Sequence, residues 1–288
     1  MKRKLALSLL WLLHLLPMPV IRILGAGIGE LLYILLRRRR HVGLTNLRLC
    51  FPDWPPGRHE QVLHQHFREL GATFLAYGKL FFSSAAELKA LIKVEGEEHF
   101  LAAKQRQPTI ALAPHFMGLD FGGIRATIDH AGASMYAAQR GIFNELSLEV
   151  RSRFRSPTLI RRGDGLRPVI KALRQHIPFY YLPDQDLGPK ESIFVDFFGI
   201  PTATVPALGR LAAMTGAAVV PMVTRLEGNH FVTRYFPALG HFPTDDPAAD
   251  TRRMNAFIEE QIITAPSQYY WLHRRFKTRP ESTPSLYR

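Results

Sequence analysis

Short apolar runs alternate with helical segments after residue 91, and this alternation limits the folds that the chain can adopt. Strands that alternate with helices form a largely parallel sheet whose two faces are covered by helices. The sequence therefore predicts an α/β fold with a mostly parallel central sheet. The expected strands cover 92–94, 109–113, 134–137, 158–160, 178–182 and 217–223, and the expected helices cover 144–154, 166–175, 206–215 and 245–263. Two further strands, 194–197 and 230–236, are expected to be antiparallel and peripheral.

The first forty residues differ from the rest of the chain. A basic start, Met1-Lys2-Arg3-Lys4, precedes an apolar stretch from Leu5 to Leu36, and four arginines, Arg37 to Arg40, follow it. A secretory signal peptide would instead end its apolar region at a small-residue cleavage site. Pro17 and Pro19 interrupt the stretch, so we interpret residues 1–40 as a retained N-terminal membrane anchor.

Two paths of this anchor through the membrane are open. The two prolines, Arg22 and Glu30 do not suit one straight span of about 20 apolar residues, so a kinked span or a helix pair that dips into the bilayer fits the sequence. Gly25 and Gly29 lack the spacing of a nucleotide-binding loop and are interpreted as helix-packing positions. The arginine cluster next to the main body predicts that this body is cytoplasmic.

The remaining residues, 41–288, are expected to form one domain without a linker that divides it. We predict a helical cover over 41–90 and an α/β core over 91–288. Apolar residues recur in the cover at helical spacing, namely at Leu63, Phe67, Leu70 and Phe74.

The charge of the chain indicates an anionic partner. Lys and Arg number 37 against 24 Asp and Glu, which gives a net charge of +13. Such a charge attracts nucleic acid, an acidic protein or an anionic lipid surface, and does not choose among them.

Cys50 is the only cysteine, so an internal disulfide and a multi-cysteine zinc site are excluded. His64 and His66 lie in a polar helical stretch and are expected to face solvent, and we predict neither a metal nor a cofactor.

Two titratable side chains follow the apolar run 109–113, within the segment Pro114-His115-Phe116-Met117-Gly118-Leu119-Asp120. Open α/β sheets bind their ligands at the carboxyl ends of strands. A histidine and an aspartate suit a general base and the carboxylate that fixes its tautomer. Five residues of ideal helix turn through about 500°, so the pair requires a loop or a helix start. We expect His115 to be a catalytic base and Asp120 to hold it.

Other polar residues follow other expected strands. Asp184 and Asp186 come directly after 178–182, where they could bind a metal, hold a cation or form a turn, and a turn is the default. Arg140 and Arg162 also follow expected strands. Because a guanidinium offers paired donors, arginines at one sheet edge suit phosphate groups.

These residues carry a family resemblance. The segment His115 to Asp120 resembles the H-x4-D/E motif of the glycerolipid acyltransferase superfamily, and the chain more closely resembles the bacterial late lipid A acyltransferases, the lauroyl and myristoyl transferases of lipopolysaccharide assembly. The likeness covers nearly the whole chain. Besides the N-terminal anchor, it rests on the segments 46–52, 183–189, 197–204, 219–222 and 268–280, the last of which reads QYYWLHRRFKTRP.

The resemblance implies a reaction. Enzymes of this family move a fatty acyl chain from acyl-carrier protein to a hydroxyl on a 3-hydroxyacyl chain of the lipid A precursor. His115 would be the base and Asp120 its orienter. Arg140 and Arg162 would contact acceptor phosphates or sugar carboxylates, and Asp184 and Asp186 would order the substrate site. No covalent acyl-enzyme is expected, since no G-x-S-x-G motif is present and Cys50 precedes the core.

The same resemblance implies partners and a location. Acyl-carrier protein is acidic, and the acceptor and the anionic lipids of the bacterial inner membrane carry negative charge, which suits a basic face rimmed by Arg37 to Arg40 and the basic residues 274–279. We expect no nucleic-acid partner, because no nucleic-acid-binding module is recognisable. Two alternatives remain: an acyltransferase for a lysophospholipid or another glycolipid, and a non-catalytic membrane-bound protein that binds lipid or nucleic acid.

Overall fold

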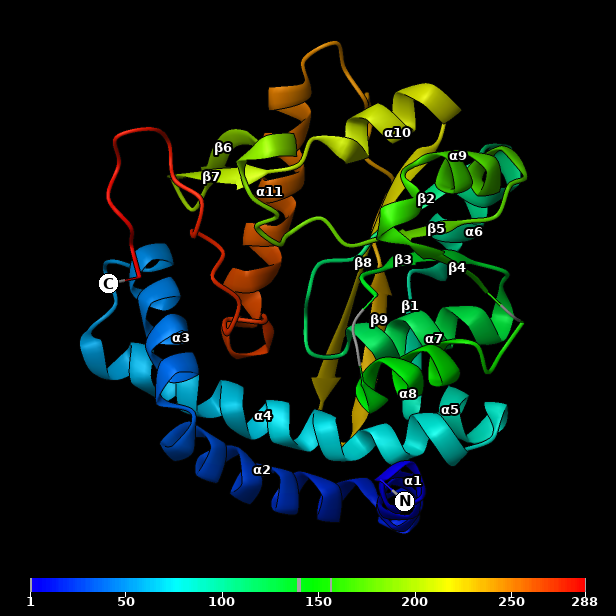
Figure 1. Cartoon of the computed structure of the whole chain (residues 1–288). Coiled ribbons are helices and arrows are strands. Elements are labelled where there is room, and N and C mark those ends of the chain that lie inside the picture. The colour runs from blue at the N-terminus through cyan, green and yellow to red at the C-terminus, as the bar shows by residue number, and fades with distance from the viewer. Residues whose placement is uncertain (1, 139–140, 156, 288) are drawn as a thin grey trace.

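The computed structural model describes residues 2–138, 141–155 and 157–287. Within these residues, seven strands form one sheet in the order β1-β9-β8-β2-β5-β3-β4 (Figure 1). Neighbouring strands are parallel except for β8 and β9, so the predicted mostly parallel sheet is confirmed. The strands are β1 (Ile92–Glu95), β2 (Thr109–Leu112), β3 (Ala133–Tyr136), β4 (Thr158–Arg161), β5 (Phe179–Tyr181), β8 (Ala218–Glu227) and β9 (His230–Tyr235).

Strand β8 shows why helices cover both faces of the sheet. Val219 and Val223 pack into the core on one face, whereas Val220 and Met222 pack into the core on the other face. Successive side chains of a strand point to opposite faces, so a strand that is apolar at every position requires cover on both. Helices α6 and α7 cover one face, and α9, α10 and α11 cover the other.

The helices of the core follow the expected pattern. They are α5 (Ala85–Leu91), α6 (Glu97–Arg106), α7 (Leu119–Asp129), α8 (Ile142–Arg151), α9 (Arg167–Arg174), α10 (Ala207–Thr215) and α11 (Pro247–Thr264). Strand β6 (Ile193–Phe197) is antiparallel to β7 (Ile200–Thr204) and lies outside the main sheet, as predicted. Strand β9 is antiparallel to β8, but the expectation that it is peripheral was wrong, because it lies between β8 and β1.

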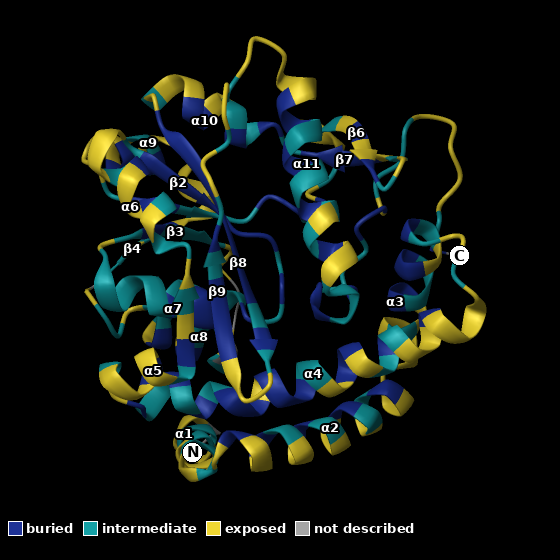
Figure 2. Ribbon diagram, turned by 180° about the vertical axis from the view of Figure 1, so that it is seen from behind, coloured by how far each residue is buried: buried dark blue, intermediate teal, exposed yellow. Residues whose placement is uncertain are grey.

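Four helices precede the core: α1 (Lys2–Leu15), α2 (Met18–Leu35), α3 (Arg37–Cys50) and α4 (Pro56–Phe82). In Figures 1 and 2, α2 runs alongside α4 on the outside of the molecule, and α1 lies at one end of α2. Among the described helices, α2 is long and apolar enough to cross a membrane. In helix α4, Leu63 and Phe67 are buried as predicted, but Phe74 is 55% exposed, contrary to the predicted apolar face.

Close backbone contact joins α2 to α4. A Cβ atom added to Gly25 would lie 2.3 Å from Cα of Ala72, and one added to Gly29 would lie 2.2 Å from the carbonyl oxygen of Phe67. These distances leave no room for a side chain, so the two glycines allow the helix backbones to approach. The interpretation of Gly25 and Gly29 as packing positions is confirmed.

Candidate functional site

His115 and Asp184 come from neighbouring strands. Strands β2 and β5 are parallel, and Leu112 is in register with Tyr181. His115 and Asp184 each lie three residues beyond these partners, so the two chains leave the sheet side by side. Nδ1 of His115 lies 2.7 Å from Oδ1 of Asp184, and the backbone N–H of His115 donates to Oδ2 at 2.9 Å.

The Asp184 carboxylate fixes the state of the His115 ring. Burial by itself raises the pKa of the Asp184 carboxyl, but the nearby His115 and its two hydrogen bonds outweigh burial, so the net pKa lies below the usual value. An ionised carboxylate can only accept a hydrogen bond. The Nδ1 atom that faces it must therefore be the donor, which places the proton of a neutral imidazole on Nδ1. Nε2 of His115 is then the free acceptor that a general base needs.

Asp120 does not hold His115 in this structure, which corrects the sequence-based expectation. Its Oδ1 accepts hydrogen bonds from Nη2 of Arg151 at 2.7 Å and from Nε of Arg151 at 3.1 Å, and the hydroxyl of Tyr77 donates to its Oδ2. The reason is local: Asp120 is the second residue of helix α7, and its side chain points toward Tyr77 of α4 and Arg151 of α8.

Two glycines bring the start of α7 against the sheet. A Cβ atom on Gly118 would lie 2.7 Å from the carbonyl oxygen of Thr224, and one on Gly122 would lie 2.0 Å from its hydroxyl oxygen. Because no other residue fits at these distances, the chain after His115 turns closely over strand β8. This contact sets the direction in which Asp120 leaves the helix.

Two cavities meet near these residues. The larger, of about 760 Å³, is lined by His115, Arg162 and the ends of β3 and β5. The smaller, of about 80 Å³, is mainly apolar and lies between α7 and strands β3 and β5. Among the described residues, Arg151 is the arginine that lines both. A larger cavity lined in part by a histidine and arginines, next to a smaller and more apolar one, suits a substrate that has a charged head and a fatty chain.

The predicted substrate-binding residues have different positions. Arg162 lines the same cavity as His115, whereas Arg140 lies outside the described residues. Asp184 contacts His115 directly. Asp186 forms the turn that was the default interpretation: its Oδ1 accepts from the backbone N–H of Gly188, and its Oδ2 accepts from the backbone N–H of Thr278. Asp186 therefore orders the loop rather than lining the cavity.

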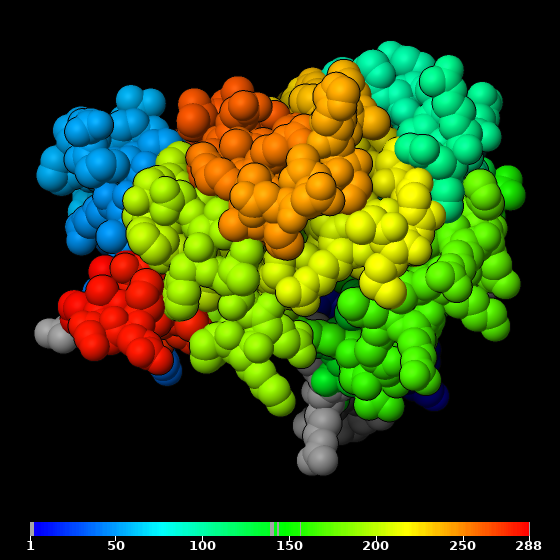
Figure 3. Space-filling model, turned by 90° about the horizontal axis from the view of Figure 1, so that it is seen from above, coloured from blue at the N-terminus to red at the C-terminus, as the bar shows by residue number. Residues whose placement is uncertain are grey.

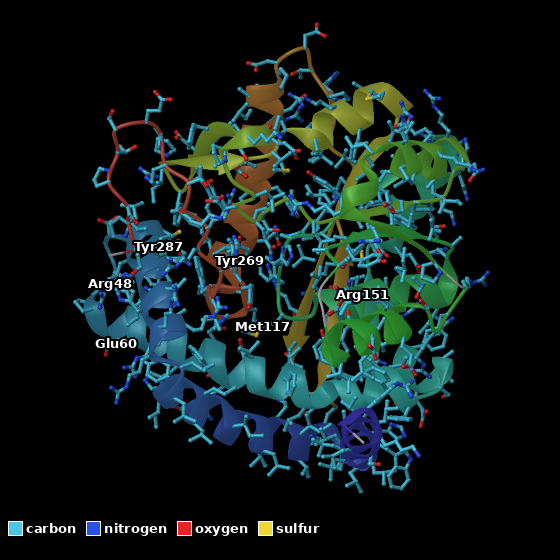
Figure 4. All side chains as sticks on the ribbon, viewed as in Figure 1. Arg48, Glu60, Met117, Arg151, Tyr269 and Tyr287 are labelled. Carbon is cyan, nitrogen blue, oxygen red and sulfur yellow. The ribbon has the colours of Figure 1, made fainter. Side chains whose placement is uncertain are left out.

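Backbone hydrogen bonds join the C-terminal segment to the chain around His115. The backbone N–H of Met117 donates to the carbonyl of Gln268 at 2.9 Å, and that of Tyr270 donates to the carbonyl of His115 at 2.9 Å. Figure 4 shows Tyr269 and Met117 close together in this region. Burial, the charge of Asp184 and a hydrogen bond to that carboxylate raise the pKa of Tyr269, so its hydroxyl stays a donor to Asp184.

The end of the chain is itself held by helix α3 and by the β6–β7 hairpin. Nδ2 of Asn46 donates to the carbonyls of Trp271 and His273 at 2.7 and 2.8 Å. Arg275 donates to the carbonyl of Ala203 and is 3% exposed, so it cannot belong to the basic docking rim that the sequence suggested. Figure 3 shows the C-terminal residues against this hairpin and the helical cover. Cys50 is also buried in α3, which raises the pKa of its thiol.

No sequence pattern pointed to Arg151 or Tyr77. Both contact Asp120, but they lie 31 and 43 positions from it in the chain. Arg151 is the last residue of α8, and Tyr77 lies in α4. Only the packing of three helices brings them together, and helical periodicity does not report such packing.

His66 is buried, so the expectation that it faces solvent was wrong. Its Nδ1 lies 2.9 Å from the carbonyl of Ser267, next to the segment that supports His115, and burial lowers its pKa from 6.5 to about 4. In the unfolded chain the ring binds a proton more readily, so the free energy of unfolding falls as the pH falls from 6.5 to 4, by about 3 kcal/mol in total for this residue.

We expect His66→Asn to reduce this acid sensitivity, because the amide can still donate to Ser267 but does not titrate in this range. Urea unfolding between pH 4 and pH 7 measures the effect. His176→Asn, at an exposed histidine, is the control and should retain the slope of the unsubstituted protein. Equal slopes for the His66 variant and the unsubstituted protein would contradict the assignment.

Comparison with known proteins decides the family. The sequence model described as "Bacterial lipid A biosynthesis acyltransferase" matches residues 3–278. The chain belongs to this family.

Three relatives of the lipid A acyltransferase family from Escherichia coli (strain K12) illustrate the similarity. The "Lipid A biosynthesis lauroyltransferase" is 33% identical, with 98% of this chain and 94% of that protein covered. The "Lipid A biosynthesis palmitoleoyltransferase" is 34% identical, with 98% and 92% covered. The "Lipid A biosynthesis myristoyltransferase" is 32% identical, with 91% and 81% covered.

Membership in the lipid A acyltransferase family confirms the resemblance that the sequence motifs indicated. It also confirms that the chain is an acyltransferase. The relatives are named for three different acyl chains at nearly equal identity, so family membership does not specify the length of the chain that is transferred.

Proposed function

We propose that this acyltransferase moves a fatty acyl chain from acyl-carrier protein to the hydroxyl of a 3-hydroxyacyl chain on a lipid A precursor. The observation that supports this proposal most directly is the His115–Asp184 pair, with its 2.7 Å contact at the edge of a cavity. The His115 side chain is 20% exposed, whereas the side chain of Asp184 is 1% exposed. The base can therefore reach a substrate while its carboxylate partner stays shielded from water.

The chemistry follows from this arrangement. Nε2 of His115 removes the proton of the acceptor hydroxyl as the oxygen attacks the thioester carbonyl carbon, and a tetrahedral intermediate forms. When the C–S bond breaks, the imidazolium returns the proton to the departing thiolate, so the products are an ester and a free thiol. Asp184 remains ionised throughout and stabilises the imidazolium.

Arg151 and Arg162 have separate proposed roles. Arg151 lines both cavities and is held by Asp120, so its guanidinium can stabilise negative charge that develops on the thioester oxygen. Asp120 then acts by positioning Arg151. Arg162 is exposed and lines the larger cavity, where it suits a phosphate of the acceptor. By position, Arg140 is proposed for the same anionic group.

The charge distribution supports the proposed partners and location. Arg37, Arg38 and Arg39 are exposed at the start of α3, and a basic surface attracts both an acidic carrier protein and anionic lipids. We propose that residues 1–40 attach the domain 41–288 to the bacterial inner membrane, with the catalytic cavity on the cytoplasmic side, where acyl-carrier protein is available.

A direct assay of the purified full-length protein tests this function. With acyl-carrier protein loaded with a fatty acid, we expect acylation of a tetra-acylated lipid A precursor, detected by mass spectrometry as one added acyl chain. Lysophosphatidic acid serves as the competing acceptor. Acylation of lysophosphatidic acid without acylation of the lipid A precursor would overturn the proposed acceptor, and fragmentation of the product would show whether the new ester lies on a 3-hydroxyacyl chain.

A further inference from the structure

Helices α1 and α2 expose large apolar side chains on their outer faces. In α2 these are Val20, Ile23, Leu24, Ile28, Leu31, Ile34 and Leu35, and Ile23 is 73% exposed. The exposed positions recur at helical spacing, so they form one stripe along the whole length of the helix. Helix α1 adds Leu5, Leu9 and Leu12, which are also exposed and also recur at helical spacing. Exposed apolar side chains that lie next to one another in this way mark a surface that contacts a protein or a membrane.

The opposite face of α2 is fixed to α4. Ile21 is fully buried, and the close approach at Gly25 and Gly29 leaves no space between the helix backbones. In Figure 1 the two helices lie side by side over most of the length of α2. Helix α2 therefore cannot enter a bilayer without bringing α4 to the same depth.

Charged side chains accompany this contact. Glu30 of α2 pairs with His64 and Arg68 of α4, at 2.9 and 3.3 Å. Glu30 lies about 18 Å along the roughly 27 Å length of α2, at a rise of about 1.5 Å per residue. If α2 crossed the membrane, these charges would lie within the hydrocarbon region, where charged groups are strongly disfavoured.

Both ends of the helix pair are bonded to the same catalytic body. At the start of α1, Arg3 forms a salt bridge with Glu149 of α8 at 2.8 Å. Beyond the end of α2, Arg39 donates to the carbonyl of Leu272 at 3.0 Å. One folded body cannot lie on both sides of a bilayer, so these two contacts together exclude a single crossing between them. A second crossing by α1 is excluded by length, because its 14 residues span about 21 Å against a hydrocarbon core of about 30 Å. The basic residues at both ends instead suit the anionic headgroups of a single leaflet.

We infer that α1 and α2 lie in the plane of one anionic leaflet, with their outer apolar faces at the boundary between headgroups and acyl chains, and do not cross the bilayer. This inference rests on the membrane attachment proposed above. It makes the protein a one-sided membrane enzyme whose position over the lipid surface is set by two rigidly packed helices.

A depth profile along α2 tests the inference. Single cysteines for nitroxide labelling replace Val20, Leu24, Ile28, Leu31 and Leu35 in the full-length protein, and the unsubstituted chain controls for labelling at the buried Cys50. The labelled proteins are mixed with vesicles of phosphatidylethanolamine and phosphatidylglycerol. Collision rates with oxygen and with a water-soluble nickel chelate then give the depth of each label.

We expect all five labels to lie at one shallow depth, within about 5 Å of each other, because the stripe runs parallel to the surface. Asp245→Cys, in the exposed loop before α11 on the side opposite α2 in Figure 1, should stay in water. A profile that is deepest at Ile28 and rises by about 10 Å toward both helix ends would overturn the inference and leave the membrane attachment intact. If the collision rates of the α2 labels did not change when vesicles were added, both the in-plane position and the proposed membrane attachment would be overturned.

Discussion

Replacing His115 with alanine should lower kcat for acyl transfer about 10²–10⁴-fold. General-base catalysis by a positioned side chain contributes about 10²–10⁴-fold, and in the proposed reaction His115 is the residue that removes the proton of the acceptor hydroxyl. The buried Asp184 carboxylate loses its side-chain partner but keeps the backbone N–H at position 115, so we also expect a measurable fall in the melting temperature of a protein that still folds. The initial rate of acyl transfer from acyl-carrier protein, with the melting temperature of the same sample, measures both effects.

The matched control is His230→Ala, which removes an exposed histidine at the start of strand β9 and should leave the rate unchanged. If the His115 variant kept more than a tenth of the rate while remaining folded, the proposed mechanism would fail. The family assignment would stand in that case, because it does not depend on the identity of the base.

The sequence predicted His115 at the site because the strand before it is recognisable. Residues 109–112 are buried at every position and apolar after Thr109, so their carboxyl end was a reasonable place for a catalytic group. The same argument placed Asp184 after β5. Helix boundaries were predicted well for α10 and α11, where Pro206 directly precedes the first helix and Pro247 begins the second.

The partner of His115 could not be predicted, because it depends on the order of strands in the sheet. Strands β2 and β5 are neighbours, although β3 and β4 lie between them in the sequence. Asp184 is therefore next to His115 in space while 69 positions away in the chain. Asp120 was nearer in sequence, and the start of helix α7 turned it toward Arg151.

The burial of individual polar residues could not be predicted from the sequence either. His66 lies in a helix that is polar on one side and buried on the other, and only the contact with Ser267 shows which side it occupies. Arg275 belongs to a basic run that reads as an exposed tail, yet it is enclosed against Phe197 and the β6–β7 hairpin. In both cases the deciding neighbour comes from a distant part of the chain.

Asp184→Asn should lower kcat about 10²–10⁴-fold, and more strongly than Asp120→Asn. His115 presents two donors to Asp184, its backbone N–H and its Nδ1–H. An asparagine has one oxygen and one NH₂ group, so if the oxygen accepts from the backbone, the NH₂ group faces Nδ1. The proton of the ring would then move to Nε2, and the base would lose its free acceptor. Asp120→Asn leaves this tautomer unchanged and weakens only the support of Arg151.

Double variants distinguish the roles of Asp184 and Asp120 more clearly than the single variants do. If Asp184 acts only through His115, adding Asp184→Asn to His115→Ala should lower the residual rate by less than about threefold, because residues that act as one unit give non-additive losses. Adding Asp120→Asn to His115→Ala should lower the rate by nearly the full factor seen for Asp120→Asn alone, since Arg151 would act on the thioester oxygen independently of the base. The opposite pattern, with Asp120 non-additive and Asp184 additive, would restore Asp120 as the partner of the base and would mean that the 2.7 Å contact between His115 and Asp184 is structural.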